Sequence, residues 1–172
     1  FVPSRGLGDV YKRQKDNKMI FVQPAYLPSV NYFKDFNDND LVYNINLGLD
    51  ESDYFDETYM SNENGVFKVK VPTTNKNKSK FQRDIKIDYK TNWIKSHTHS
   101  FQSAYGKFPY FIFYLDPILN VLKTNHKFMI DLNYDLLSLF LELLNYDQKP
   151  LKNTSDNIIN NKKTILKSNN SL

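Results

Sequence analysis

The chain has 172 residues, a formal net charge of +4 and no cysteine, so disulfides, thiolate metal sites and cysteine nucleophiles are excluded. The positive charge lies at the two ends: residues 1–14 carry a surplus of +2 and residues 147–172 of +3, which leaves −1 for residues 15–146. Because a nucleic-acid-binding protein carries its basic excess on the folded surface, we expect no nucleic-acid partner.

The first 14 residues, "FVPSRGLGDVYKRQ", are set aside because they resemble a translated sequencing adapter. They contain Gly-x-Gly but lack the preceding strand and further glycine of a phosphate-binding fingerprint. The length of the remaining chain suits one domain, which is predicted at residues 15–146. After residue 146 the apolar periodicity is lost, which predicts a polar tail or a truncated C-terminal part at residues 147–172. No apolar run approaches the roughly 20 residues of a membrane-spanning helix, and we expect a cytoplasmic protein without a membrane span.

The first elements predicted are two strands joined by a short helix. The apolar run "KMIFVQ" (residues 18–23) predicts a buried strand that ends at Pro24. Residues 41–47 predict a second strand, parallel to the first. Between them, Ser29 is a candidate N-cap of a helix with a buried face of Val30, Phe33 and Phe36.

A hairpin comes next, because Asn64-Gly65 separates two β-rich segments and both residues tolerate a positive φ. In "VFKVKV" (66–71) the alternation places Phe67, Val69 and Val71 toward the core. Residues 73–80 ("TTNKNKSK") are expected to be flexible. In "RDIKIDY" (83–89), the alternation predicts a half-buried strand with Ile85 and Ile87 on its inner face.

The second half of the chain is predicted to be helical. Thr91 or Asn92 caps a helix to about residue 105, whose shared face is Trp93, His97, Phe101 and Ala104. A short helix begins near Pro109 and another restarts at Asp116-Pro117. Residues 128–144 predict a central helix with a main stripe of Leu132, Leu136, Leu139, Phe140 and Leu143. The fold class is α/β or α+β, a small N-terminal sheet with a hairpin packed on C-terminal helices.

Three motifs and their order carry a family resemblance: "VQPAYLPSVNYF", "RDIKID" and "NWIKSHTHSFQSAYGKFPYF", followed by the leucine-rich helix. Over about residues 19–145 the chain resembles the WbqC-like family of bacterial proteins, which is associated with O-antigen and other surface-polysaccharide gene clusters. The resemblance implies a role in polysaccharide biosynthesis and suggests transfer of an aminoacyl group such as glycine, or another acyl group, to a sugar. The chain departs from the family at "YFDETYM" (54–60), where a basic motif is usual.

The candidate substrate-binding residues are Gln23, Tyr26, Tyr105 and Arg83. Gln23 and Tyr26 follow the end of the first strand, where open α/β sheets bind their ligands. The flanking prolines fix the directions of the Gln23 amide and the Tyr26 hydroxyl, although a rigid turn without a ligand explains the same pattern. Arg83 closes a run of basic residues that suits a sugar phosphate or an anionic acyl carrier, although charge runs in loops are usually only hydrated.

His97 is the candidate catalytic base, and the alternative is a packed histidine on the face of Trp93 and Phe101. His97 and His99 lie two residues apart on the predicted helix and cannot bind one metal ion from a common face. The acidic residues between Asp50 and Glu57 fail the spacing of an EF-hand, so we expect a solvated loop there. The sequence predicts neither a metal nor another cofactor.

Two functions remain open at this point. In the first, the protein is an aminoacyl or acyl transferase whose partners are a sugar or nucleotide-sugar substrate and an acyl donor. In the second, it is a non-catalytic sugar- or partner-binding module of glycan assembly, in which aromatic side chains stack on the ligand: Tyr26, Tyr32, Tyr105 and Tyr110. The sequence makes no prediction of the oligomeric state.

Overall fold

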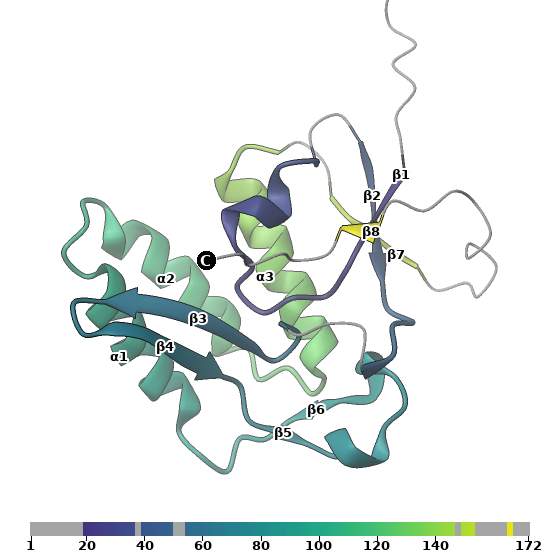
Figure 1. Ribbon diagram of the computed structural model, residues 1–172, viewed down its shortest axis with the longest axis horizontal. Coiled ribbons are helices and arrows are strands. Elements are labelled where there is room, and N and C mark those ends of the chain that lie inside the picture. Colours follow the sequence, from purple (N-terminus) through teal and green to yellow (C-terminus); the bar gives the residue numbers. More distant parts are fainter. Residues whose placement is uncertain (1–18, 37–38, 50–53, 147–148, 154–164, 167–172) are drawn as a thin grey trace, which may run out of the picture.

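The computed structural model describes residues 19–36, 39–49, 54–146, 149–153 and 165–166 (Figure 1). They form a four-stranded sheet of order β7-β2-β1-β8, two two-stranded antiparallel sheets, and three α-helices in the C-terminal half. The mixed α/β class with an N-terminal hairpin and C-terminal helices is therefore confirmed. None of the helices in the described part of the chain combines the length and apolar character needed to span a bilayer.

The predicted pair of parallel strands is confirmed. β1 (Met19–Val22) pairs with β2 (Asp40–Asn44) in parallel register, and the crossover contains the 3-10 helix η2 (Val30–Phe33). Phe33 and Phe36 are buried as expected. Val30 is 87% exposed, so its prediction as a core residue is wrong, because it lines an open cleft beside η2 instead.

Two segments of the expected polar tail contribute strands to the sheet. β7 (Leu151–Asn153) pairs in parallel with β2, and β8 (Ile165–Leu166) pairs in parallel with β1. The sequence predicts neither strand, because strands of two or three residues are too short to show a period of two. The division into residues 1–14, 15–146 and 147–172 stays a prediction.

The hairpin is confirmed as β3 (Glu57–Asn62) and β4 (Gly65–Lys70), with Gly65 at φ 115° in the turn. Val69 and Val71 are buried, and Phe67 is half-buried. The segment expected to be flexible contains β5 (Thr73–Thr74) and the 3-10 helix η4 (Lys76–Lys78). β5 pairs with β6 (Lys86–Ile87), which follows the 3-10 helix η5 (Gln82–Asp84); Ile85 and Ile87 are buried as predicted.

Three helices complete the fold: α1 (Trp93–Tyr105), α2 (Phe111–Leu122) and α3 (Met129–Leu143). The predicted cap of α1 is confirmed, since the Asn92 side chain accepts from the Lys95 backbone N–H. The predicted restart at Asp116-Pro117 is wrong, because α2 is continuous with Pro117 inside it. An internal proline costs a helix about 3 kcal/mol, and burial of Leu115 and Leu122, at about 1.5–3 kcal/mol each, offsets that cost.

Helix α3 is central, as predicted, and lies between the four-stranded sheet and the part formed by α1, α2 and the hairpin (Figure 1). Tyr43 of β2 donates its hydroxyl to the Ile130 carbonyl at 3.0 Å, which fixes the helix on the sheet. The residues of α3 that are buried differ from the predicted stripe, because the four-stranded sheet packs on one side of the helix and the part formed by α1, α2 and the hairpin packs on the other. Its buried residues are Met129, Ile130, Leu132, Asn133, Leu136, Leu137 and Leu141.

Candidate functional site

An open cleft of about 1020 Å³ lies between the Pro28 turn with η2, the hairpin, α1, α2 and α3. Its wall is rich in aromatic side chains, and the rings come from four separate parts of the chain: Tyr54, Tyr59, Phe101, Tyr105, Phe108, Phe111, Tyr114 and Phe140. Thr58 of β3 donates its hydroxyl to the Leu27 carbonyl at 3.1 Å and so joins two sides of the cleft. The cleft is therefore a product of tertiary packing rather than of one loop.

Among the described residues that line this cleft, no side chain is charged and none is a histidine. The polar groups are the tyrosine hydroxyls together with Ser29, Asn31 and Thr58. Sites for small molecules are typically apolar with a few polar groups that fix orientation. The composition of the wall suits an uncharged ligand that offers flat apolar faces and some hydroxyl groups.

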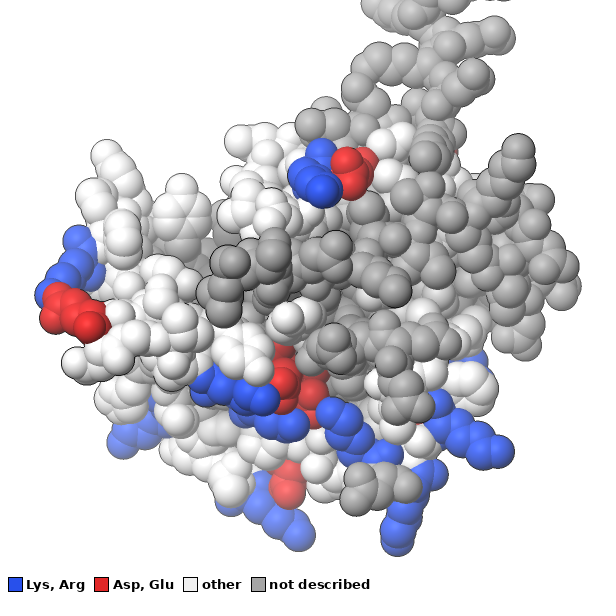
Figure 2. All heavy atoms as spheres, viewed as in Figure 1, with Lys and Arg blue, Asp and Glu red and all other residues white. Residues whose placement is uncertain are grey.

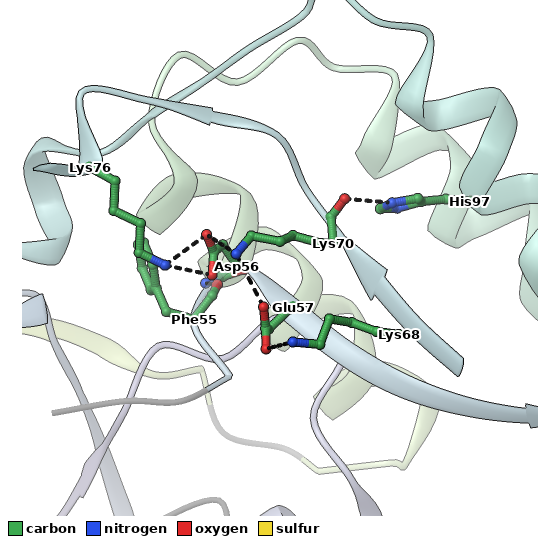
Figure 3. A network of polar contacts seen from close by, with 8 residues as sticks. Phe55, Asp56, Glu57, Lys68, Lys70, Lys76 and His97 are labelled. Carbon is green, nitrogen blue, oxygen red and sulfur yellow. Dashed lines mark hydrogen bonds and ion pairs between the residues drawn. The ribbon is translucent and has the colours of Figure 1, made fainter. Parts of the chain in front are cut away.

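Tyr26 and His97 form a buried hydrogen-bonded pair behind the wall of the cleft. The Tyr26 hydroxyl lies 2.8 Å from His97 Nδ1. On the other side of the ring, His97 Nε2 lies 3.1 Å from the Lys70 carbonyl oxygen (Figure 3). Because a carbonyl oxygen only accepts, Nε2 carries the proton, and Nδ1 accepts the bond donated by Tyr26. Leu27, next to Tyr26, and Phe101, one turn after His97, both line the cleft.

Both members of the pair are held neutral. Burial lowers the pKa of His97 to about 4, against a smaller opposing effect of the bond to the Lys70 carbonyl. Burial raises the pKa of the Tyr26 phenol far above its usual range. Each imidazole nitrogen already has a partner, so base catalysis by His97 stays a prediction that requires the bond to Tyr26 to open. What the pair does in this structure is connect the turn after β1 to α1 and β4.

The other predicted site residues lie in different places. Gln23 is buried and absent from the cleft wall, and its backbone carbonyl accepts a bond from the Tyr32 hydroxyl. Tyr105 lines the cleft, with its ring 6.3 Å from that of Phe108. Arg83 lies in η5, where it donates to the Asn46 side chain and stacks on Phe81, outside the cleft lining. Tyr105 is thus the one predicted binding residue that reaches the cleft surface.

Of the four tyrosines predicted to stack on a ligand, only Tyr105 lines the cleft. Tyr26 and Tyr32 are buried in the core, and Tyr110 is exposed outside the cleft lining. The sequence reasoning missed the wall that α2 supplies. The signal was the run "FPYFIFYL", which has too many large apolar residues for a helix that buries one face.

Asp56 and Glu57 belong to an ion-pair network rather than to a solvated loop (Figure 3). Asp56 is only 2% exposed and accepts from Lys76 Nζ at 3.0 and 2.9 Å. Glu57 pairs with Lys68 at 2.8 Å and Lys70 at 3.2 Å; burial raises its pKa, but the two lysine hydrogen bonds outweigh this and lower it. The expectation of a solvated loop is wrong for Asp56; Asp50, Glu51 and Asp53 lie outside the described residues.

A second hollow of about 400 Å³ lies at the start of α1. It is lined by His97, by Lys68 and Lys70, and by the hydroxyl-bearing residues Thr91, Ser96 and Ser100. Trp93 also lines it, and its indole Nε1 is buried without a hydrogen-bond partner. Within the described part of the chain, no three His, Cys, Asp or Glu side chains are grouped so that they could hold a metal ion.

The family assignment follows from the sequence match. Residues 23–170 match the model of the WbqC-like protein family. The chain belongs to this family. No curated protein and no solved structure shows a significant match.

The WbqC-like match contains every residue of the cleft wall and all five predicted site residues. It extends past residue 146 and also includes β7 and β8. Membership of the WbqC-like family therefore covers the four-stranded sheet, apart from the N-terminal strand β1, as well as the cleft.

Proposed function

We propose that this WbqC-like protein acts in the biosynthesis of bacterial surface polysaccharide, such as O-antigen, and that its aromatic cleft binds a sugar unit. The role in polysaccharide biosynthesis is what the family resemblance implies. The binding role rests on one observation, the cleft lined by eight aromatic rings and, among the described residues, by no charged side chain.

The physical chemistry of the wall suits a sugar. A pyranose ring has faces of C–H groups, which pack against the electron-rich faces of aromatic rings, and hydroxyl groups that need hydrogen-bond partners at the edge. The tyrosine hydroxyls and Asn31 supply such partners. With about 1020 Å³, the cleft lies at the upper end of the range of small-molecule sites, so it has room for more than one sugar ring.

The same wall disfavours the diphosphate of a nucleotide sugar. A buried diphosphate needs cationic partners or backbone N–H groups, and the described lining contains no lysine or arginine. We therefore propose that the sugar, rather than the phosphates, occupies the cleft.

Aminoacyl or acyl transfer, such as glycyl transfer to a sugar, is the second candidate function. It is favoured by the hollow at the start of α1, where His97 lies among Thr91, Ser96 and Ser100. Transfer requires a base in the reactive state, and His97 becomes one only when Tyr26 releases Nδ1. Because the hydrogen bond between Tyr26 and His97 must first open, we place acyl transfer second to sugar binding as the proposed function.

Calorimetric titration with a panel of oligosaccharides and nucleotide sugars tests the binding role. We expect Tyr105→Ala to weaken saccharide binding about tenfold through loss of ring stacking, and Tyr105→Phe to keep most of the affinity. Phe81→Ala is the matched control, since Phe81 is an exposed aromatic residue outside the cleft. If the wild type and Tyr105→Ala bind every saccharide with equal affinity, the cleft is not the saccharide-binding site.

Mass spectrometry of the sugar after incubation with an activated glycyl or acyl donor tests the second function. Binding without a mass increase supports a non-catalytic module. A mass increase that disappears in His97→Gln supports transfer and rejects binding alone.

A further inference from the structure

The end of α1, the turn that follows it and the first turn of α2 expose a concentrated set of large apolar side chains, here called the α2 apolar face. Six residues of the segment 105–114 have exposed fractions between 44% and 74%: Tyr105, Phe108, Tyr110, Ile112, Phe113 and Tyr114. Helix α2 buries its opposite side through Leu115 and Leu122. The apolar side chains on the exposed side of α2 therefore do not contribute to the core of a single chain.

The size of this face is unusual for a monomer. With about 200 Å² of surface per large side chain, the six residues together expose roughly 750 Å². The largest apolar patch of a monomeric protein is about 300–600 Å². One side of a stable protein–protein interface buries about 800 Å². The exposed area of the α2 apolar face exceeds that of the largest apolar patch on a typical monomer and approaches the area that one partner buries in a stable interface.

The charge distribution decides which partner fits. The end of the molecule that carries α2 is largely white in Figure 2, apart from one blue and red pair at its edge, and most of the other visible blue and red groups lie along the lower side. Within residues 105–114 the only charged side chain is Lys107, and it forms an ion pair with Glu63. An anionic membrane surface requires a basic excess beside the apolar residues, which the described part of this face lacks.

An uncharged face can meet its own copy without like-charge repulsion, which is the condition for a twofold interface between identical surfaces. The geometry points to a second copy of this chain as the partner: we propose that the protein forms a homodimer through the α2 apolar face.

The dimer has a consequence for the cleft. Tyr105, Phe108 and Tyr114 belong both to the α2 apolar face and to the cleft wall. A second copy seated on this face therefore also contacts this part of the cleft wall. The inference goes beyond the proposed sugar binding and does not depend on it, because dimerisation is measured without a saccharide.

Sedimentation equilibrium over about 1 to 100 µM chain tests the proposal. We expect the wild type to approach twice the chain mass of 20.3 kDa. Ile112→Glu places a charge within the face and should raise the dimer Kd by about 30-fold or more. Because Ile112 is 69% exposed, the variant should keep its fold, which circular dichroism verifies; Phe113→Arg is a second variant of the same kind.

Leu151→Glu is the matched control, since Leu151 is also 69% exposed but lies on β7 at the other end of the molecule (Figure 1). We expect it to remain dimeric. A wild-type protein that stays monomeric over the whole range overturns the proposal, as does a dimer that Ile112→Glu and Phe113→Arg leave unchanged. A monomer that co-sediments with neutral or anionic lipid vesicles also overturns it and assigns the face to a membrane.

Discussion

The buried His97 makes the stability of the protein depend on pH in a defined window. In the unfolded chain the pKa of His97 has its ordinary value of 6.5, and in the folded chain burial lowers it to about 4. Between these values the unfolded state binds more protons than the folded state, so the free energy of unfolding rises with pH. The full contribution is present above pH 6.5 and is lost as the pH falls toward 4. Between about pH 7.5 and about pH 5 the loss is about 2 kcal/mol.

Urea denaturation of the wild type and His97→Gln at these two pH values measures the effect. The glutamine does not titrate, so subtracting the loss of stability of His97→Gln from that of the wild type removes the contributions that the two proteins share. With a typical m-value, the 2 kcal/mol corresponds to a shift of the urea midpoint by roughly 1 M that only the wild type shows. Equal losses of stability in both proteins would contradict the placement of a neutral, buried His97.

Two further predictions concern the core beside this pair. Trp93→Ala should cost about 3 to 5 kcal/mol in thermal unfolding, because Trp93 is buried against the ring of His97, with centroids 4.9 Å apart. A melting temperature near that of the wild type would contradict this. Lys76→Met should cost about 2 kcal/mol, because it leaves the buried Asp56 carboxylate with Lys70 at 3.7 Å. Lys107→Met, which removes an exposed pair, is its control and should cost less.

Elements with strong local signals could be predicted from the sequence. Asn64-Gly65 specifies a hairpin by its own backbone preferences, and Asn92 specifies a helix start through its side chain. β7 and β8 could not be predicted, because their pairing depends on β2 and β1 more than 100 positions earlier in the sequence. The restart expected at Pro117 failed because tertiary burial outweighed a local backbone preference.

The site was less accessible to sequence reasoning than the fold. The motif around Tyr26 lies next to the cleft, but the partner of Tyr26, His97, lies 71 positions away, and the sequence does not show that the two side chains bond to each other. The polarity of Gln23 suggested a ligand contact, whereas the chain folds it into the core. To predict that α2 forms part of the cleft wall, one must know which face of this helix is buried. The sequence does not show this, because the run is apolar at nearly every position.

Saturation-transfer NMR on mixtures of the protein with free oligosaccharides tests the central claim most directly. If the aromatic cleft binds a sugar, irradiation of the tyrosine and phenylalanine protons must transfer saturation to the C–H protons of the sugar ring, and Tyr105→Ala must reduce the transfer while Phe81→Ala must not. Absence of transfer to any saccharide, or transfer confined to the nucleotide of a nucleotide sugar, would contradict the account.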